Sequence, residues 1–255
     1  MSIVGARGGE FPSERVPRLS VITISKNDPV GLKRSLSSAS EQNFRDFEHI
    51  LVLAGSSREV RVPEGQHLRV ILDGKPGISN SLNAGVQAAR GEWVQFLNGG
   101  DSFVDQESLQ AMMDHAEHGV EMVCSFARVL SRTFTIPRHS LQPGRGEFIY
   151  ASHQASIYRK HLFEQYGLFD PGVRIHMDLE WLIRLPIDLP YVFVGKETIL
   201  FDPHGVSATR VVESSFEEAR ILWNAQEYRM RAAGVLLLRL PFRIIRREIR
   251  RWSGQ

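Results

Sequence analysis

The stretch that decides the fold is Gly77–Asp101, GISNSLNAGVQAARGEWVQFLNGGD. Its first part places apolar residues on one helical face: Ile78, Leu82, Val86 and Ala89. Gly91 ends this helix, and residues 92–98 are predicted to form a buried strand. The strand leads into Asn98-Gly99-Gly100-Asp101, which puts one carboxylate on a glycine-rich turn. The stretch therefore predicts a helix followed by a strand that ends on an acid.

The same rhythm of buried strands and amphipathic helices extends to both sides. Apolar, β-rich runs predict further strands at 19–25, 49–55, 68–74 and 121–129. Helical patterns fall at 31–42, 76–91 and 105–119, with Asp105 as the expected N-cap of the last. This alternation predicts an α/β domain with a mostly parallel sheet, in which ligands bind outside the carboxyl ends of the strands. Asp101 lies at such an end.

The second half of the chain is less regular. Residues 147–160 are predicted as a strand entering a helix at 160–167, and 176–186 as a short helix stopped by Pro186. Residues 191–201 form a long strand or a strand pair, a polar loop follows at 202–210, and the chain is mostly helical from Ser214. The expected division is a flexible leader over 1–17, one domain over 18–212 and a helical extension over 213–255.

The composition fits one substantial core, because 42% of the 255 residues are hydrophobic and 24% are charged. The single cysteine, Cys124, excludes an intramolecular disulfide and is predicted to fill a buried strand position. No stretch reaches the length of a transmembrane helix, and residues 1–18 lack the apolar core of a signal peptide. We therefore expect a cytoplasmic protein.

The net charge of +2 conceals an asymmetry along the chain. Residues 229–255 contain eight arginines and one glutamate, so they carry +7 and leave −5 on the rest. An acidic body gives no reason to expect nucleic acid as a partner. Five apolar residues of the tail have helix-compatible spacings: Leu240, Ile244, Ile245, Ile249 and Trp252. This basic amphipathic pattern predicts peripheral attachment to the inner face of the plasma membrane. Packing on the acidic body and a homodimer contact are the alternatives.

Four motifs follow one another along the chain, and their order is informative. They are VITISKND (21–28), the stretch Gly77–Asp101, HQASIYRK (153–160) with GLFD (167–170), and MDLEWLIRL (177–185). Together they resemble bacterial family 2 glycosyltransferases of the GT-A fold, over roughly Leu19 to Arg210. The resemblance implies that a nucleotide-diphosphate-sugar donor gives its sugar to a hydroxyl of a cell-envelope glycan or lipid-linked acceptor. It also implies an inverting reaction.

Asp101 is the expected metal ligand. The leaving diphosphate gains negative charge, which a divalent cation held by a strand-end carboxylate neutralises. Mg²⁺ or Mn²⁺ needs few protein ligands, because phosphate oxygens and water complete its shell. The family's motif often has two or three acids, but here Asn98 and Gly100 replace the others. The alternative is that Asp101 only caps its turn.

Asp178 is the expected catalytic base, by the same resemblance. An inverting transferase needs a base that takes the proton of the attacking acceptor hydroxyl. Glu180 is the rival, and the two side chains point about 200° apart on a helix. Trp181 lies on the apolar side of the helix and could still flank the acceptor. The alternative for Asp178 is an ordinary N-cap.

Three further residues complete the expected acceptor and metal sides. His204 lies in a loop where some relatives place a histidine on the metal, although a lone loop histidine is more often solvated. His153 and Gln154 match the family's acceptor-side motif. Their alternative role is a hydrogen-bonded pair that supports the site from a strand end.

The nucleotide-binding residues match the family less well. Many relatives have an aspartate after the second strand that reads uracil, whereas this chain has Ala54. Either Asp73 or a backbone carbonyl reads the base instead, or the donor is not a uridine nucleotide. The remaining candidates for donor binding are Thr23, Ser25, Lys75, Asn80, Asn98 and Gly100.

Two rival functions remain open. A nucleotidyltransferase would need a glycine- and lysine-rich phosphate loop after the first strand, which SKNDPVG lacks. A weakened nucleotide-binding scaffold or partner subunit at the membrane fits the substitutions Ala54, Asn80, Asn98 and Gly100. The enzyme is favoured because Asp101 and Asp178 both remain.

Overall fold

The structure is a computed structural model, and it describes residues 15–62, 68–72, 75–129, 152–186, 188–202, 209–225, 236–237 and 240–241. Its centre is one sheet of eight strands in the order β3-β2-β1-β4-β7-β6-β8-β5. The strands are β1 (Leu19–Lys26), β2 (Phe47–Ala54), β3 (Leu68–Leu72), β4 (Trp93–Phe96), β5 (Ser102–Phe103), β6 (Met122–Val129), β7 (Ser156–Arg159) and β8 (Tyr191–Phe201).

The sheet is mostly parallel, as the alternation of strands and helices predicts. β1 pairs in parallel with β2 and β4, and β2 with β3. β7 lies antiparallel between β4 and β6, while β8 runs parallel to β6. Six strands therefore end at one edge of the sheet, and β7 begins there. We call it the carboxyl edge.

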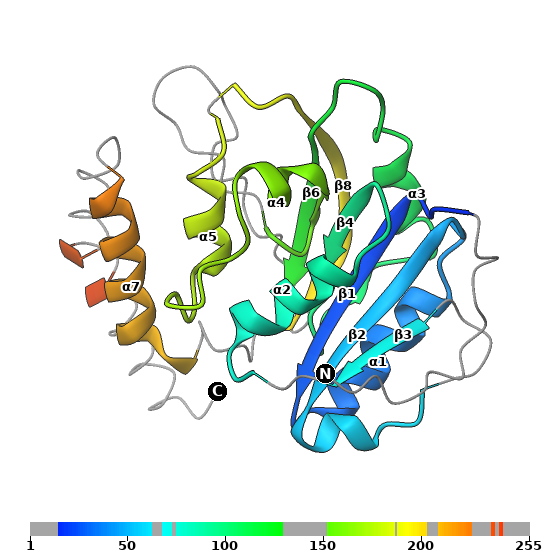
Figure 1. Ribbon diagram of the computed structural model, residues 1–255, viewed down its shortest axis with the longest axis horizontal. Coiled ribbons are helices and arrows are strands. Elements are labelled where there is room, and N and C mark those ends of the chain that lie inside the picture. Colours follow the sequence, from blue (N-terminus) through cyan, green and yellow to red (C-terminus); the bar gives the residue numbers. More distant parts are fainter. Residues whose placement is uncertain are drawn as a thin grey trace.

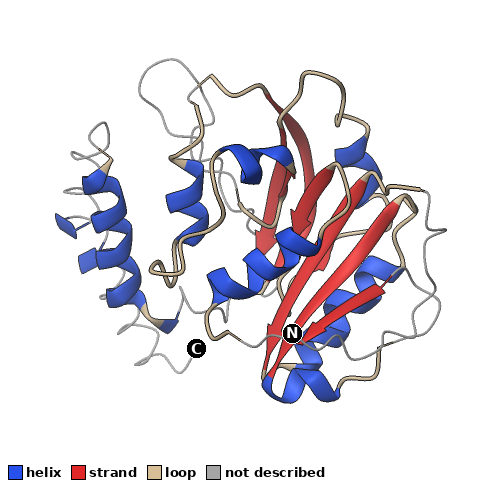
Figure 2. Cartoon of the chain, viewed as in Figure 1, coloured by secondary structure: helices blue, strands red, loops and turns tan. Residues whose placement is uncertain are grey.

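The helices cover both faces of the sheet (Figures 1 and 2). They are α1 (Pro29–Ser40), α2 (Ile78–Ala88), α3 (Ser108–Met113), α4 (His161–Gln165), α5 (Met177–Leu182) and α7 (Val211–Asn224), with a 3₁₀ turn η1 (Gly55–Glu59) after β2. The buried clusters place α1 and α3 on one face. Helices α2, α4 and α5 share the other face, where α7 packs outside α5.

The core explains why these segments fold as they do. β1 and β2 are apolar on both faces because helices cover both, which gives central strands their continuous apolar runs. Trp181 stacks on Phe163 at 4.2 Å between ring centroids, and both belong to the larger cluster. Cys124 is buried in β6, as predicted. No helix in the described part of the chain is long and apolar enough to cross a bilayer.

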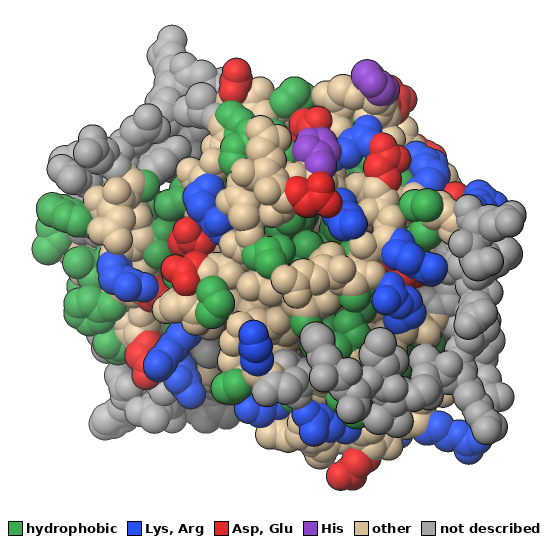
Figure 3. Space-filling model, viewed as in Figure 1, with side chains coloured by type: hydrophobic (Ala, Val, Ile, Leu, Met, Phe, Trp, Pro, Cys, Tyr) green, Lys and Arg blue, Asp and Glu red, His purple; other side chains and the backbone are tan. Residues whose placement is uncertain are grey.

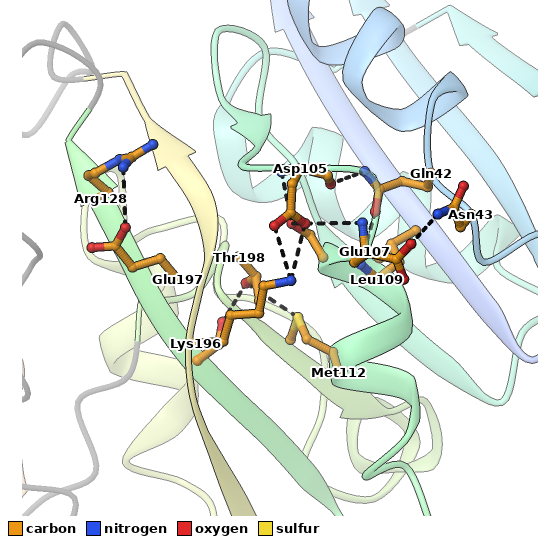
Figure 4. A network of polar contacts seen from close by, with 12 residues as sticks. Gln42, Asn43, Asp105, Glu107, Leu109, Met112, Arg128, Lys196, Glu197 and Thr198 are labelled. Atoms are coloured by element: carbon orange, nitrogen blue, oxygen red, sulfur yellow. Dashed lines mark hydrogen bonds and ion pairs between the residues drawn. The ribbon is translucent and has the colours of Figure 1, made fainter.

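The prediction that Asp105 is the N-cap of the third helix is wrong. The helix begins later, at Ser108, and Glu107 occupies the cap position. Asp105 instead caps the preceding turn, since its Oδ1 accepts hydrogen bonds from the Glu107 amide and the Ser108 hydroxyl. It also forms an ion pair of 3.0 Å with Lys196 of β8, and its carbonyl accepts a hydrogen bond from Gln42 (Figure 4).

The predicted boundary at residue 213 falls inside α7. This helix is tied to the body by Glu217, whose carboxylate accepts hydrogen bonds from the amides of Arg174, Ile175 and His176 at 2.7–3.0 Å. These bonds lower the pKa of Glu217, although partial burial acts against them. The basic tail and the leader lie mostly outside the described residues, so the predictions made for them stand as predictions.

Candidate active site

Asp101 is nearly fully buried at the carboxyl edge, 3% exposed, just after β4. Its Oδ1 accepts a 2.8 Å hydrogen bond from the Asp202 amide, and Gln154 also donates to this carboxylate. Burial raises the pKa of Asp101 to about 8, and the nearby Asp202 carboxylate adds to this, while the two hydrogen bonds and Arg34 lower it. A carboxyl buried in this way either holds its proton or pairs with positive charge, such as a bound cation.

The turn that carries Asp101 is shaped by its neighbours. Gly100 has φ +100°, a conformation that favours glycine, and a side chain there would come within 3.1 Å of Asp202. The Ser35 hydroxyl donates to the Asp101 carbonyl at 2.7 Å and accepts from the Gly100 amide at 3.1 Å. Asn98 has a buried side-chain oxygen with no hydrogen-bond partner among the described residues. The turn thus presents one ordered acid and one unsatisfied acceptor.

Asp202 and Arg34 belong to this site, and sequence reasoning missed both. Asp202 directly follows β8, and Arg34 of α1 bonds its carboxylate at 3.2 Å and the Gly100 carbonyl at 3.0 Å. The available signal was the position of Asp202 at a strand end, which is the same signal that marked Asp101. His204 lies outside the described residues, so its expected contact with a metal stays a prediction.

His153 and Gln154 lie where the chain enters β7, between the two key acids. Gln154 bonds Asp101, and its carbonyl accepts a 3.1 Å bond from Gln95. His153 is buried and stacks on Phe96 at 4.2 Å, and neither of its ring nitrogens has a partner among the described residues. Burial lowers its pKa to about 4, while the charge of Asp178 acts in the opposite direction. The dipeptide therefore links the surroundings of the two acids.

Asp178 lies in the first turn of α5 and is half-buried. Its Oδ1 accepts a hydrogen bond from the amide of Leu179 at 2.8 Å. Glu180 instead pairs with Arg184 at 3.2 Å, and partial burial raises its pKa. Trp181 is fully buried and donates to the Gly167 carbonyl at 2.8 Å, which leaves it no surface for an acceptor. Of these two acids, Glu180 is thus the one that is paired with an arginine, whereas the Asp178 carboxylate accepts a bond from a backbone amide.

The segment before α5 is held by side chains that the sequence did not single out. Asn83 of α2 both donates to the carbonyl of Phe169 and accepts from its amide, at 2.8 and 3.0 Å. Ser79 donates to the Val173 carbonyl at 2.8 Å. With Glu217 on the other side, these bonds fix the position at which α5 begins.

The residues expected to bind the nucleotide include two that lie towards the end of β1, next to β2. Asn27, with φ +56°, accepts a 3.0 Å bond from the Ser56 amide, and a side chain at Gly55 would lie 1.8 Å from its Oδ1. Ser25 shares a 2.9 Å hydrogen bond with Ser57. Thr23 is fully buried and bonds His49 at 2.8 Å, so in this structure it ties β1 to β2.

The other predicted donor residues lie around α2. Asn80 bonds the carbonyl of Pro76 at 2.8 Å and so closes the first turn of the helix. Lys75 is exposed just before it. Asp73 lies outside the described residues. Their donor-binding roles stay predictions.

The residues at this edge fit a divalent cation. Asp101 and Asp202 offer two carboxylates of the kind that Mg²⁺ and Mn²⁺ prefer, and burial together with the neighbouring Asp202 carboxylate raises the pKa of Asp101. No group of three or more His, Cys, Asp or Glu side chains in the described ranges could hold a metal. Protein ligands from these ranges would therefore supply only part of the shell, and diphosphate oxygens and water the rest.

Comparison with known proteins decides the family. The family model described as glycosyl transferase family 2 matches residues 20–174, which is more than half of the chain. The chain belongs to this family. The matched range contains Asp101, His153 and Gln154 and ends just before α5. The resemblance drawn from the motifs is thereby confirmed.

Relatives of this chain are found among curated bacterial proteins. An uncharacterized glycosyltransferase of Mycobacterium tuberculosis is 28% identical over 221 residues, covering 80% of this chain and 82% of the relative. EpsJ of Bacillus subtilis, also an uncharacterized glycosyltransferase, is 28% identical over 64% of this chain, which spans about half (54%) of EpsJ. A PGL/p-HBAD biosynthesis glycosyltransferase of Mycobacterium bovis is 26% identical, with 66% of this chain and 69% of the relative covered.

Solved structures confirm the GT-A fold of this family 2 chain. The mannosyltransferase PcManGT of Pyrobaculum calidifontis, in complex with GDP-Man and Mn²⁺, superposes with a TM-score of 0.67 at 16% identity, over 97% of this chain and 79% of that one. S. aureus TarS in complex with UDP-GlcNAc superposes with a TM-score of 0.63 at 17% identity, over 86% and 70%. At such identities the likeness concerns the fold alone.

Proposed function

We propose that this family 2 protein is an inverting, metal-dependent glycosyltransferase. It moves one sugar from a nucleotide-diphosphate sugar to a hydroxyl of a cell-envelope glycan or lipid-linked acceptor, on the cytoplasmic side of the membrane. The observation that carries the proposal is the link between the two acids: Gln154 bonds Asp101, and its neighbour His153 lies in the field of Asp178.

The two acids have separate tasks in this reaction. The Asp178 carboxylate takes the proton of the acceptor hydroxyl, whose oxygen forms a bond to the anomeric carbon. The bond between that carbon and the donor diphosphate breaks, and the diphosphate leaves with the electron pair. Asp101 and Asp202 would hold a divalent cation, which when bound supplies positive charge that stabilises the leaving diphosphate.

The surroundings of both acids support these tasks. Asn83, Ser79 and Glu217 fix the segment before α5, so the Asp178 helix is held in place before substrate arrives. Asn98 and His153 present buried polar atoms without partners in the described structure. A sugar hydroxyl could donate to the Asn98 oxygen, and a sugar or phosphate oxygen could accept from the N–H of the His153 imidazole. Burial also keeps the His153 imidazole neutral near pH 7.

Relatives support the choice of substrates. Of the proteins with similar folds, one is seen with UDP-GlcNAc and another with GDP-Man and Mn²⁺, so the fold accepts nucleotide sugars with either base. A relative named for PGL/p-HBAD biosynthesis supports an envelope acceptor. In this chain Ala54 stands where an aspartate would read uracil, which leaves the base to experiment.

Calorimetric titration tests the proposal. The protein is titrated with UDP, GDP and dTDP, each with and without Mn²⁺, and the same titrations are run on Asp101→Asn and Asp178→Asn. We expect Mn²⁺-dependent binding of one nucleotide, lost in Asp101→Asn and kept in Asp178→Asn. Failure of well-folded protein to bind any nucleotide would refute the enzyme and favour a partner subunit at the membrane. Sugar transfer by Asp178→Asn at the wild-type rate would refute the base.

A further inference from the structure

Helix α7 has two faces with different properties. Its inner face is buried against the body, through Ser214, Ser215, Ala219, Ile221 and Leu222. The Ser214 hydroxyl also forms a 2.8 Å hydrogen bond with His176, next to the amides that Glu217 binds. The outer face is exposed and includes three large apolar side chains. A globular protein normally turns such residues inward, so the exposed face needs an explanation.

The exposed residues form one continuous line along the helix. Val212 is 44% exposed, and Phe216 and Trp223 are each 56% exposed. Steps of four and seven residues are close to whole helical turns, so the three side chains fall within an arc of about 40°. We call these three residues the outer stripe. Hydrophobic side chains gather at the left edge of the molecule in Figure 3, where Figure 1 places α7.

The chain that follows α7 indicates what the outer stripe meets. Residues 229–255 carry +7 on eight arginines, while the rest of the protein carries −5. Anionic lipid is complementary to this tail, and aromatic side chains such as Phe216 and Trp223 favour the boundary between headgroups and acyl chains. Leu237, also 73% exposed, adds apolar surface early in the same tail.

A second protein molecule fits the outer stripe less well. Stable dimers bury about 800 Å² on each partner, contributed by some 20–30 residues. The outer stripe has three residues, and its helix carries Glu213, Glu218 and Arg220 beside them. A lipid surface needs no matching shape, so a short apolar stripe followed in the sequence by a cationic segment is sufficient.

We propose that the outer stripe of α7 docks on an anionic lipid surface, with the arginines of residues 229–255 supplying the attraction. The inner face of the same helix holds residues 174–176, directly before the helix that carries Asp178. Docking would therefore set the height of the candidate base above the lipid. This consequence rests on the proposed function, whereas the docking itself does not.

Vesicle sedimentation with the full chain tests the docking. Wild type, the double variant Phe216→Ser/Trp223→Ser and the control Val16→Ser are mixed with phosphatidylcholine vesicles with and without 30% phosphatidylglycerol. Val16 is 67% exposed and precedes the amino end of β1, so its replacement removes exposed apolar surface away from α7. We expect wild type and control to bind only the anionic vesicles, and the double variant to bind at least tenfold more weakly.

Three outcomes would overturn the proposal. The first is a double variant that binds as tightly as wild type while showing the same urea midpoint. The second is absence of Trp223 quenching by brominated lipid in a Trp252→Phe background, where Trp93 and Trp181 are fully buried. The third is a concentration-dependent dimer that the double variant abolishes, which assigns the outer stripe to a second copy. Nucleotide titration of the same samples separates these failures from a failure of the proposed function.

Discussion

Replacing Asp101 with asparagine should change how the stability of this protein depends on pH. Burial raises the pKa of Asp101 from 3.8 to about 8. Between about pH 4 and pH 8 the unfolded chain has therefore released a proton that the folded protein still holds. The contribution of the group to stability is complete below pH 4 and is lost as the pH rises through 8. An asparagine keeps the hydrogen bond from the Asp202 amide but does not titrate.

The size of this change in stability follows from the shift in the pKa of Asp101. Each pH unit in that window lowers the free energy of unfolding of wild type by about 1.4 kcal/mol relative to the variant. From pH 5 to pH 7 the difference should grow by about 3 kcal/mol in favour of asparagine. His49 and His153 act with the opposite sign, because burial lowers their pKa values to about 3 and about 4. Both histidines are present in both proteins, so the comparison isolates Asp101.

Urea unfolding at pH 5, 6 and 7, followed by tryptophan fluorescence in the presence of EDTA, measures this difference. Asp114→Asn is the matched control, because its carboxylate is exposed to water on the surface. We expect the control to follow wild type at every pH. A gap between wild type and Asp101→Asn that stays constant from pH 5 to pH 7 would refute the burial argument. The variant should also lose sugar transfer, so here stability and activity oppose each other.

Three further predictions concern other parts of the site. Glu217→Gln should lower the turnover rate at least tenfold with nucleotide affinity unchanged, since Glu217 positions the segment before Asp178; equal losses of rate and affinity would contradict this positioning role. Gly55→Ala should destabilise the protein by about 1–3 kcal/mol in urea unfolding, because φ is +55° and the new methyl would overlap Asn27. His153→Phe should raise KM for one of the substrates in steady-state kinetics, because phenylalanine cannot hydrogen-bond to it. His153→Asn should retain more activity, and equal losses in the two variants would contradict a hydrogen bond from the imidazole.

The first half of the fold could be predicted from the sequence because its signals are local. β1 and β2 are buried on both faces, so their apolar runs mark them regardless of context. Asp101 could be found because it follows such a run. The role of Asp105 was predicted wrongly, because an aspartate that caps a turn cannot be told in the sequence from one that caps a helix. What distinguishes them is whether the helix starts one residue or three residues later.

The contacts that complete the site could not be predicted, because their partners are distant in the sequence. Arg34 and Asp202 are 168 residues apart, yet they share a 3.2 Å contact beside Asp101. Asn83 and Glu217 form hydrogen bonds with backbone groups of the segment before α5, and backbone groups carry no sequence signature. The position of β7 between β4 and β6 is likewise set by pairing, and it is this pairing that brings His153 to the carboxyl edge.

The opposite edge of the sheet is built quite differently. Glu48, at the start of β2, is fully buried and bonds Ser20, Arg69 and Arg90, which lie at or near the starts of β1, β3 and β4. These ion pairs and the hydrogen bond join the starts of four strands, and none of the four residues lies at the carboxyl edge. Loops at the carboxyl edge can therefore diverge among paralogues, or be exchanged by an engineer, while the contacts of Glu48 stay intact. Substrate choice in this scaffold is free to evolve separately from foldability.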